Sequence, residues 1–330
     1  SLFQKLKIQA DYFHEKRQGI FLQRAGLPAI VGISTIPYVN IGETVNKGFD
    51  GTLEYSQQVG NVFLTARGNF TFNRNKLLNN DEPDWEYKYQ NRIGKSFGSG
   101  GTMQPFGLVA LGLFESQEEI DNSPTQTFGE YRVGDIKYQD INGDGQIDSQ
   151  DMVAMGYTNL PEIIYGFGAT AQWKGWDFNV FFQGVDHSSF FISGSTLQSP
   201  FSSGNMERAA LQEDLWGKTW MSTNTPEQNA NASYPRLSLS GAAGSSNNQQ
   251  TSSWWLRSGD FLRLKNVEIG YSLPKNILDR SFVKSLRFYV SGNNLLTFSK
   301  FKLWDPEKGG GQGSGYPLNR VVSFGLKANF

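Results

Sequence analysis

The 330-residue sequence contains no cysteine and only two histidines, His14 and His187. Without cysteine there can be no disulfide bonds, thiolate metal sites or thiol nucleophiles. Two histidines so far apart offer little material for a zinc site or a histidine-dependent catalytic site. Charged residues make up only 18% of the chain, and 30 basic against 31 acidic side chains give a formal net charge of −1. No basic surface is predicted, so nucleic-acid binding is not expected.

Long apolar runs are also missing. No segment approaches the roughly 18 consecutive apolar residues that a transmembrane helix requires. The first residues lack the layout of a signal peptide. If the chain meets a membrane, it does so with strands. Because an outer-membrane protein needs an export signal, we expect the sequence to begin downstream of the natural amino terminus.

Aromatic residues, at 14%, and glycine, with 37 residues, are abundant instead. Apolar and polar residues alternate with a period of two, which predicts strands with one apolar and one polar face. The clearest segments lie around residues 6–12, 49–56, 62–72, 163–174, 177–184, 267–273, 286–292 and 322–330, with weaker candidates at 87–97 and 105–114. A further strand-like run covers residues 131–138. The chain is therefore predicted to be all-β and antiparallel.

Strand length and the spacing of the strands favour a transmembrane β-barrel. Alternation runs for about 10 to 13 residues, close to what a tilted strand needs to cross the hydrocarbon layer. Aromatic residues gather near strand ends, where barrels place their interfacial girdles. Connections at 60–61, 175 and 274–284 are short, whereas those at 18–42, 75–134 and 188–260 are long. Barrels have short periplasmic turns and long extracellular loops. A soluble β-sandwich also alternates and stays as the alternative.

The longest loop has two further features. Residues 206–220 are predicted to form a helix, and the Ser, Asn, Gly and Gln tract at 238–253 is predicted to be a mobile surface segment. Aromatic residues of the loops either stack on sugar rings, pack against a partner, or only fold the loops onto each other. They are Trp85, Tyr87, Tyr89, Trp216, Trp220, Trp254 and Trp255.

Residues 140–151 match the 12-residue calcium loop of EF-hands. A hard cation needs six to eight converging oxygens, and Gly145 occupies the position of the sharp turn. The predicted ligands are Asp140, Asn142, Asp144, Gln146 through its carbonyl, Asp148 and Asp151. A strand-like segment precedes this loop where an EF-hand has a helix, so we predict an isolated structural site for Ca²⁺, with Mg²⁺ as the second candidate. A turn without metal is the alternative.

Other chemical motifs are weak, and the chain is not expected to be an enzyme. The glycine-rich run at 309–315 lacks the Gly-Lys-Ser/Thr ending of a phosphate loop. Adjacent carboxylates such as Glu118 and Glu119, or Glu213 and Asp214, point in different directions on a helix and are expected to be solvated charges. A glycan-active enzyme is therefore the last of three candidate classes.

Several motifs resemble one family, the SusC/RagA branch of the TonB-dependent outer-membrane transporters. They occur in one order over nearly the whole chain: NKGFDG at 46–51, GDIKYQDINGDGQID at 134–148, YGF at 165–167, WDFNVFFQG at 176–184, YPR at 234–236, WLRSGDFLRLKNVEIGYSLP at 255–274, YVSGNNLLTF at 289–298, and the ending at 316–330.

The resemblance implies that residues 1–330 are the carboxy-terminal part, roughly half, of a barrel of about 22 strands. It further implies import of oligosaccharides or peptides together with a SusD-like surface lipoprotein, energised through TonB, in the outer membrane of a Gram-negative, Bacteroidetes-like bacterium. The plug, the TonB-contact segment and the first barrel strands are missing. Because unpaired strand edges cannot persist in lipid, we expect the chain to pair with this missing half. A calcium-binding β-sandwich adhesin or surface-binding module is the alternative function.

Overall fold

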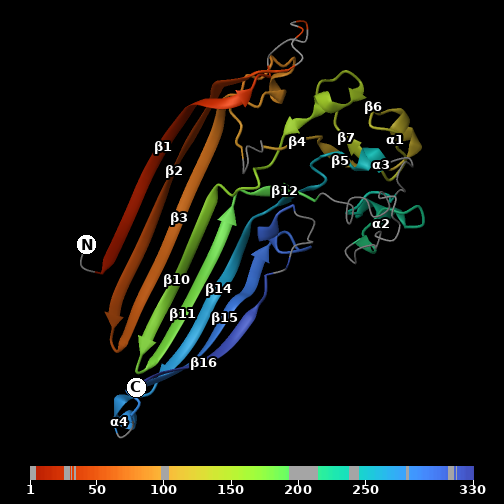
Figure 1. Ribbon diagram of the computed structural model, residues 1–330. Helices are drawn as coiled ribbons and strands as arrows, with labels where there is room; N and C mark the ends of the chain where they lie inside the picture. The colour runs from red at the N-terminus through yellow and green to blue at the C-terminus, as the bar shows by residue number, and fades with distance from the viewer. Residues whose placement is uncertain are drawn as a thin grey trace.

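The computed structural model describes residues 5–25, 30, 32, 35–97, 104–192, 215–237, 245–279, 282–310, 316 and 318–330. Eight long strands form one antiparallel sheet in the order β1-β2-β3-β10-β11-β14-β15-β16 (Figure 1). Their bounds are β1 Leu6–Gln23, β2 Tyr38–Val59, β3 Val62–Asn79, β10 Ile163–Trp173, β11 Trp176–Asp186, β14 Phe261–Ser272, β15 Ser285–Ser299 and β16 Val321–Asn329. Each matches one of the eight predicted segments, so the all-β, antiparallel fold class is confirmed.

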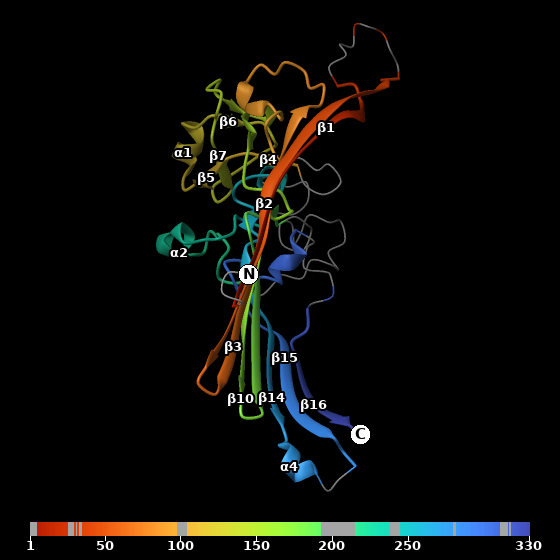
Figure 2. The ribbon, with the colours of Figure 1, turned by 90° about the vertical axis from the view of Figure 1, so that its left-hand side faces the viewer.

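One face of this sheet is apolar in every strand. The register places Val290 of β15 between Ile269 of β14 and Phe324 of β16. At the opposite edge, Leu53 of β2 pairs with Ile8 of β1. These five side chains are between 36% and 81% exposed. A soluble sandwich would cover this face with a second sheet, whereas Figure 2 shows a single layer of strands below the loops.

The opposite face is polar. Arg287 of β15 makes ion pairs with Asp177 of β11 and with Glu268 of β14, the latter at 2.6 Å. Arg67 of β3 lies over the ring of Phe181, 5.3 Å from its centroid. A hollow of about 430 Å³ on this face is lined by Lys7, Ile8, Gln9, Thr52, Leu53, Glu54, Arg67, Gly68, Asn69 and Phe181. A wet lumen wall requires this kind of surface.

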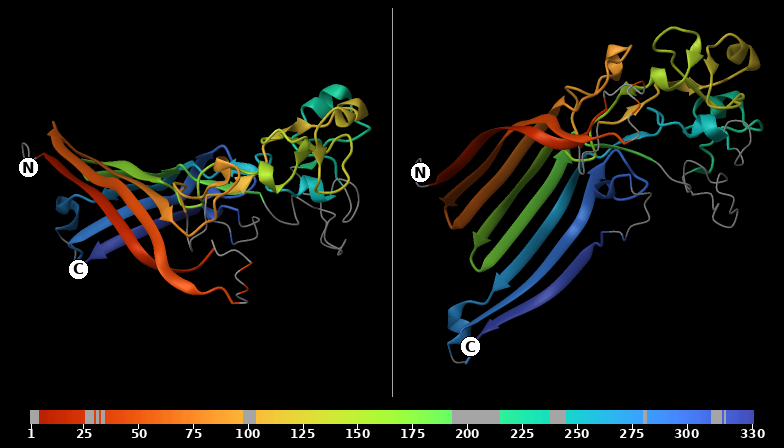
Figure 3. Two further views of the ribbon diagram at one scale, coloured as in Figure 1. Left: turned by 90° about the horizontal axis from the view of Figure 1, so that it is seen from above. Right: turned by 45° about the horizontal axis from the view of Figure 1, so that its top comes forward.

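The curved sheet does not close on itself. Strands β1 and β16 are its two edges, and in the described part of the chain they do not pair with each other (Figure 3). Each edge carries backbone groups that no ladder satisfies, which is costly in lipid. The sheet therefore has the form of an incomplete barrel wall.

Short and long connections lie at opposite ends of the sheet (Figure 1). At one end, β2 and β3 are joined at Gly60, and β10 and β11 are joined by Lys174 and Gly175, all with positive φ. Such tight turns suit the twist of the flanking strands. The connection from β14 to β15 contains α4 (Lys275–Leu278). The connections between β1 and β2, β3 and β10, β11 and β14, and β15 and β16 meet at the other end.

The long connections contain only short elements. These are β4 Phe106–Gly107, β5 Ala110–Leu113, β6 Thr125–Gln126, β7 Ile136–Tyr138, β8 Gln146–Ile147, β9 Val153–Ala154, β12 Ser189–Phe191, β13 Leu256–Ser258, α1 Gln117–Asp121, α2 Pro226–Ala230, α3 Ser245–Asn248 and the 3-10 turns η2 Lys88–Gln90, η4 Ser149–Asp151 and η7 Pro306–Lys308. No helix in the described ranges is long and apolar enough to cross a membrane.

Several predicted boundaries were wrong. Strand β1 continues to Gln23, which pairs with Tyr38, so the predicted loop 18–42 is much shorter; β3 likewise runs to Asn79. At these strand ends consecutive apolar residues, 20–22 and 77–78, interrupt the alternation although the ladder of backbone hydrogen bonds continues. The weak candidate 87–97 holds a 3-10 turn, 105–114 holds β4 and β5, and only the end of 131–138 is a strand. Local aromatic content, which packs the loops, caused these errors.

The buried apolar core lies in the long connections and not in the sheet. Its members are Leu108, Ile136, Tyr138, Ile147, Phe190, Ile192, Leu215, Tyr234, Trp255 and Phe301. They come from three different connections, so the loops fold onto one another as one assembly, which we call the loop assembly. Burial of this surface supplies the stabilisation that ordinary water-soluble packing provides.

Candidate functional site

The loop assembly is fixed by a buried polar network as well as by its apolar core. Asn247 of α3 donates to the carbonyl of Ile136 at 2.9 Å and accepts from Gln126 at 2.8 Å. Asn248 donates to Asp135 Oδ1 at 2.8 Å. Burial raises the pKa of the Tyr138 phenol well above its usual range. This phenol donates to the carbonyl of Asn247 at 2.8 Å.

The prediction that tract 238–253 is a mobile surface segment was therefore wrong for its described part. Residues 238–244 lie outside the described residues, but Asn247 and Ser252 are fully buried. Asn side chains carry both donors and acceptors, so a polar tract can fill a core when backbone groups meet it. The predicted helix 206–220 lies mostly outside the described residues, and its end, from Leu215 on, forms turns.

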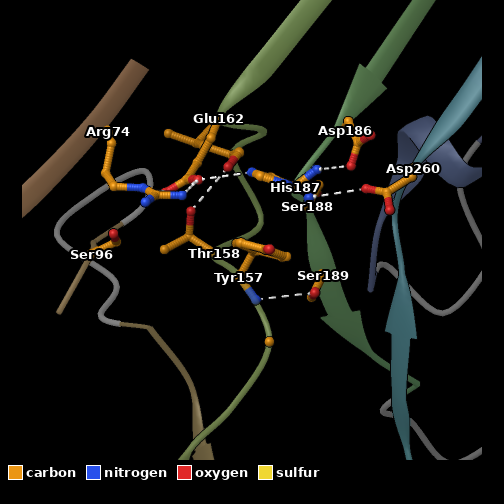
Figure 4. A network of polar contacts seen from close by, with 12 residues as sticks. Arg74, Ser96, Tyr157, Thr158, Glu162, Asp186, His187, Ser188, Ser189 and Asp260 are labelled. Carbon is orange, nitrogen blue, oxygen red and sulfur yellow. Dashed lines mark hydrogen bonds and ion pairs between the residues drawn. The ribbon is translucent and has the colours of Figure 1, made fainter. Parts of the chain in front are cut away.

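A polar cluster, the rim network, joins the sheet to the loop assembly (Figure 4). Arg74 of β3 donates from Nε and Nη2 to the two carboxylate oxygens of Glu162, at 2.8 and 2.6 Å. His187 Nδ1 lies 3.1 Å from Glu162 Oε2, and its ring stacks on Tyr157 at 4.4 Å between centroids. The Glu162 side chain is only 9% exposed. Glu162 directly precedes β10, and its partners come from β3 and from the end of β11, so it ties three neighbouring strands together where the loops leave the wall.

The next residues continue the same cluster. His187 has a φ of +58°, and its backbone N–H donates to Asp186 at 2.6 Å. The backbone N–H of Ser188 donates to Asp260, directly before β14, at 3.1 Å. A left-handed residue turns the chain sharply out of β11. On the sequence alone, no metal or catalytic site was assigned to His187, and Arg74 and Glu162, which are 88 positions apart, were not found.

Two open cavities lie on the loop assembly and share Trp220. One has a volume of about 800 Å³ and is lined by Leu111, Gly112, Leu113, Phe114, Glu115, Glu119, Lys137, Trp220, Asn224, Pro226, Glu227, Asn229, Ala230, Ala232 and Trp254. The other, of about 880 Å³, is lined by Gln117, Tyr131, Arg132, Val133, Thr219, Trp220, Met221, Ser222, Thr223, Arg236 and Leu237. The Trp220 ring lies against the backbone of Gly134, whose added Cβ would come within 2.3 Å of it.

Some of the charged side chains that line the first cavity form an ion pair, and others do not. Lys137 donates to Glu119 Oε1 at 2.8 Å, and this bond, together with the backbone N–H of Glu115, holds the pKa of Glu119 below its usual range. Glu227, in the first turn of α2, is exposed. Indole rings beside carboxylates can hold a sugar ring or the side chain and amine of a peptide.

The predicted calcium loop forms a compact turn. Asp140 accepts backbone N–H groups of Gly143 and Gly145, at 2.7 and 2.9 Å. Asp151 is fully buried and accepts the N–H groups of Ile141 and Asp148, at 2.7 and 2.9 Å. These bonds already occupy carboxylate lone pairs. In the described ranges no group of three or more His, Cys, Asp or Glu side chains is arranged to hold a metal. Cation binding by Asp140, Asn142, Asp144, Gln146, Asp148 and Asp151 stays a prediction.

The loop aromatics divide into packing and exposed residues. Trp255 is 1% exposed and donates to Asn248, whereas Trp216 is 82% exposed. Tyr87 and Tyr89 stack at 5.4 Å, and the Tyr89 hydroxyl donates to the carbonyl of Gln150 at 2.7 Å. Of the carboxylate pairs, Glu119 binds Lys137, and Glu213 and Asp214 lie outside the described residues, as do residues 311–315 of the glycine-rich run.

Comparison with known proteins bears on whether the sheet is a membrane wall or part of a soluble fold. No family model matches the sequence. The chain is 29% identical over 344 aligned positions to TonB-dependent receptor P26 of Formosa agariphila, covering 98% of this chain and 32% of the receptor. It is 24% identical to TonB-dependent receptor SusC of Bacteroides thetaiotaomicron, covering 88% of this chain and 27% of SusC. The RagAB peptide transporter superposes with a TM-score of 0.69 at 21% identity, over 99% of this chain and 34% of that chain.

The chain resembles SusC/RagA-type TonB-dependent transporters. The predicted family resemblance is confirmed. The chain spans between 27% and 34% of the length of these proteins. TonB-dependent receptors, SusC and RagAB are outer-membrane proteins of Bacteroidetes, which supports the predicted localisation. The similar proteins are named as receptors and transporters rather than enzymes, in line with the expectation that the chain is not an enzyme.

Proposed function

We propose that this chain is the carboxy-terminal part of the barrel wall of an outer-membrane transporter that imports large nutrients, oligosaccharides or peptides. The observation that carries the proposal is the apolar sheet face, which is in register across eight strands and exposed. Exposed apolar surface of this extent needs hydrocarbon around it. The similarity to SusC and to the RagAB peptide transporter supports the same function.

Transport requires more than these residues. The open edges β1 and β16 would pair with the remaining strands of the barrel, and the plug and TonB contact would belong to that other part. A SusD-like surface lipoprotein is the proposed partner on the side of the long connections. The two cavities around Trp220 are the proposed contacts for a sugar or peptide segment on its way to the lumen.

Uptake by intact cells tests the proposal. The complete gene is deleted, and uptake of fluorescent maltooligosaccharides and of a fluorescent oligopeptide mixture is measured with and without the gene restored. Loss of uptake of one class, recovered on complementation, supports import. A Trp220→Ala variant should raise the half-saturating concentration, and Trp216→Ala, an exposed tryptophan outside both cavities, is its control.

Detergent dependence tests the alternative of a soluble β-sandwich adhesin. Such a protein buries its apolar faces between two sheets and stays in solution without detergent. A complete protein that remains monodisperse in detergent-free buffer would refute the transporter proposal. Co-purification of a surface lipoprotein from the native membrane tests the partner separately.

A further inference from the structure

One of the short connections is unlike the others. The turns at Gly60 and at Lys174–Gly175 are tight and carry no large apolar side chain, but the connection from β14 to β15 includes α4 and two strongly exposed apolar residues. Ile277 is 61% exposed and Phe282 is 81% exposed. In water, such side chains would be out of place in a turn.

Phe282 continues the apolar sheet face. The ring of Phe282 stacks on that of Phe330, with 5.6 Å between centroids and 12° between planes, and Phe330 is itself 68% exposed. Phe330 follows the alternation of Leu326 and of Ala328, which pairs with Leu286. The backbone N–H of Lys284 donates to the carbonyl of Asn329 at 2.7 Å, which fixes the connection beside β16. The exposed aromatic pair is therefore an extension of the lipid-facing surface.

The position of the connection indicates its surroundings. Figures 1 and 2 show α4 beyond the strand ends, at the end of the sheet opposite the loop assembly. In barrels the short connections are periplasmic, and aromatic side chains occupy the boundary between headgroups and acyl chains. Lys275 and Lys284 are both exposed beside the apolar residues, where an amine can reach lipid phosphates.

We infer that the β14–β15 connection is an interfacial anchor that inserts Ile277 and Phe282 into the periplasmic leaflet of the outer membrane. This inference rests on the proposed membrane function. The anchor lengthens the lipid-contacting surface beyond the strand ends, and phospholipid covers Ile277 and Phe282. A polar turn in water would have no use for the stacked pair of Phe282 and Phe330.

The absence of cysteine makes site-directed spin labelling direct, because residues 1–330 contribute no competing thiol. The complete natural protein is reconstituted into phospholipid vesicles with one nitroxide at Ile277→Cys or Phe282→Cys. The reference labels are Phe324→Cys on the apolar face and Asn61→Cys in the β2–β3 turn. Collision rates with oxygen, which partitions into lipid, and with a water-soluble nickel chelate are measured.

We expect the oxygen-to-nickel collision ratio at positions 277 and 282 to exceed that at Asn61→Cys several-fold and to approach that at Phe324→Cys. A ratio equal to that at Asn61→Cys would place the connection in water and overturn the inference. Protection of the label from both reagents would mean that protein covers the connection, which would also overturn the inference. If Phe324→Cys itself reports water, the membrane proposal fails instead. Ile277→Cys leaves the Phe282–Phe330 stack intact, so the test does not depend on that contact.

Discussion

Replacing Gly134 with alanine is expected to destabilise the loop assembly much more than the same change at Gly94. Both glycines have positive φ, +89° and +84°, so alanine meets a similar left-handed backbone cost of about 1–2 kcal/mol at either position. At Gly134 the new Cβ would lie 2.3 Å from the Trp220 ring, whereas at Gly94 nothing lies within 4 Å. The ring must move, which adds about 1–3 kcal/mol of overpacking.

The difference between the two variants isolates the contact with Trp220. Hydrogen exchange of the complete protein in detergent micelles gives the local opening free energy of residues 114–136 and 219–236 for each variant. We expect the Gly134→Ala value to fall below the Gly94→Ala value by about 1–3 kcal/mol. Equal losses in the two variants would refute the reasoning, because they would show that the indole does not lie on Gly134. Nutrient uptake should fall with Gly134→Ala alone, since Trp220 lines both cavities.

Three further predictions follow from named contacts. Glu162→Gln should weaken the junction of β3, β10 and β11 by about 1–3 kcal/mol, because the charged hydrogen bonds to Arg74 are lost. The loss should appear as faster hydrogen exchange at residues 157–162 and 187–189. A double-mutant cycle with Arg74→Met should give a coupling energy above the error of the method. Because the pKa of Glu119 is lowered, its ion pair with Lys137 stabilises the fold at pH values above the ordinary pKa of 4.5, and this contribution is lost as pH falls through the folded-state pKa. Glu119→Gln should therefore flatten the acid-side slope of unfolding free energy against pH, with a total change below about 1 kcal/mol because the pair is partly exposed. An unchanged slope would contradict the assignment. Ca²⁺ at ten times its dissociation constant should stabilise residues 140–151 by about 1.4 kcal/mol, measured by hydrogen exchange with and without a chelator. The double variant Asp140→Asn, Asp144→Asn should abolish this effect. If the wild-type loop does not respond to Ca²⁺, a turn without metal is favoured.

The sheet could be predicted from the sequence because period-two alternation is a local signal. Residues such as Val290 and Phe324 share the exposed apolar face of the sheet, and their neighbours along the strand lie on the polar face, so the sequence of each strand indicates its orientation. The strand ends near Gln23 and Asn79 were missed because consecutive apolar residues, such as Phe21 and Leu22 or Leu77 and Leu78, interrupt the period-two pattern. There the ladder of backbone hydrogen bonds continues without any side-chain pattern.

The rim network and the polar core of the loop assembly could not be read from the sequence. Glu162 meets Arg74 only because β3 and β10 pair across a long connection. Asn247 and Asn248 belong to a tract whose composition is typical of flexible linkers, yet they meet the backbone of Ile136 and the carboxylate of Asp135. Composition reports what a segment could do alone, whereas these residues are buried by partners more than 100 positions away.

The loops bury their apolar core as a protein in water does, whereas the sheet leaves its apolar face uncovered. The two parts of one polypeptide are therefore stabilised by opposite solvents. Urea should loosen the end that holds Leu108 and Trp255 while micelles protect the strands, and removal of amphiphile should collapse the strands while the loops stay intact. Whether a polar substitution stabilises or destabilises the protein therefore depends on whether it lies in the loop assembly or on the apolar sheet face. At Leu108 it damages packing in any medium, but at Phe324 it is harmful in a bilayer and helpful in buffer.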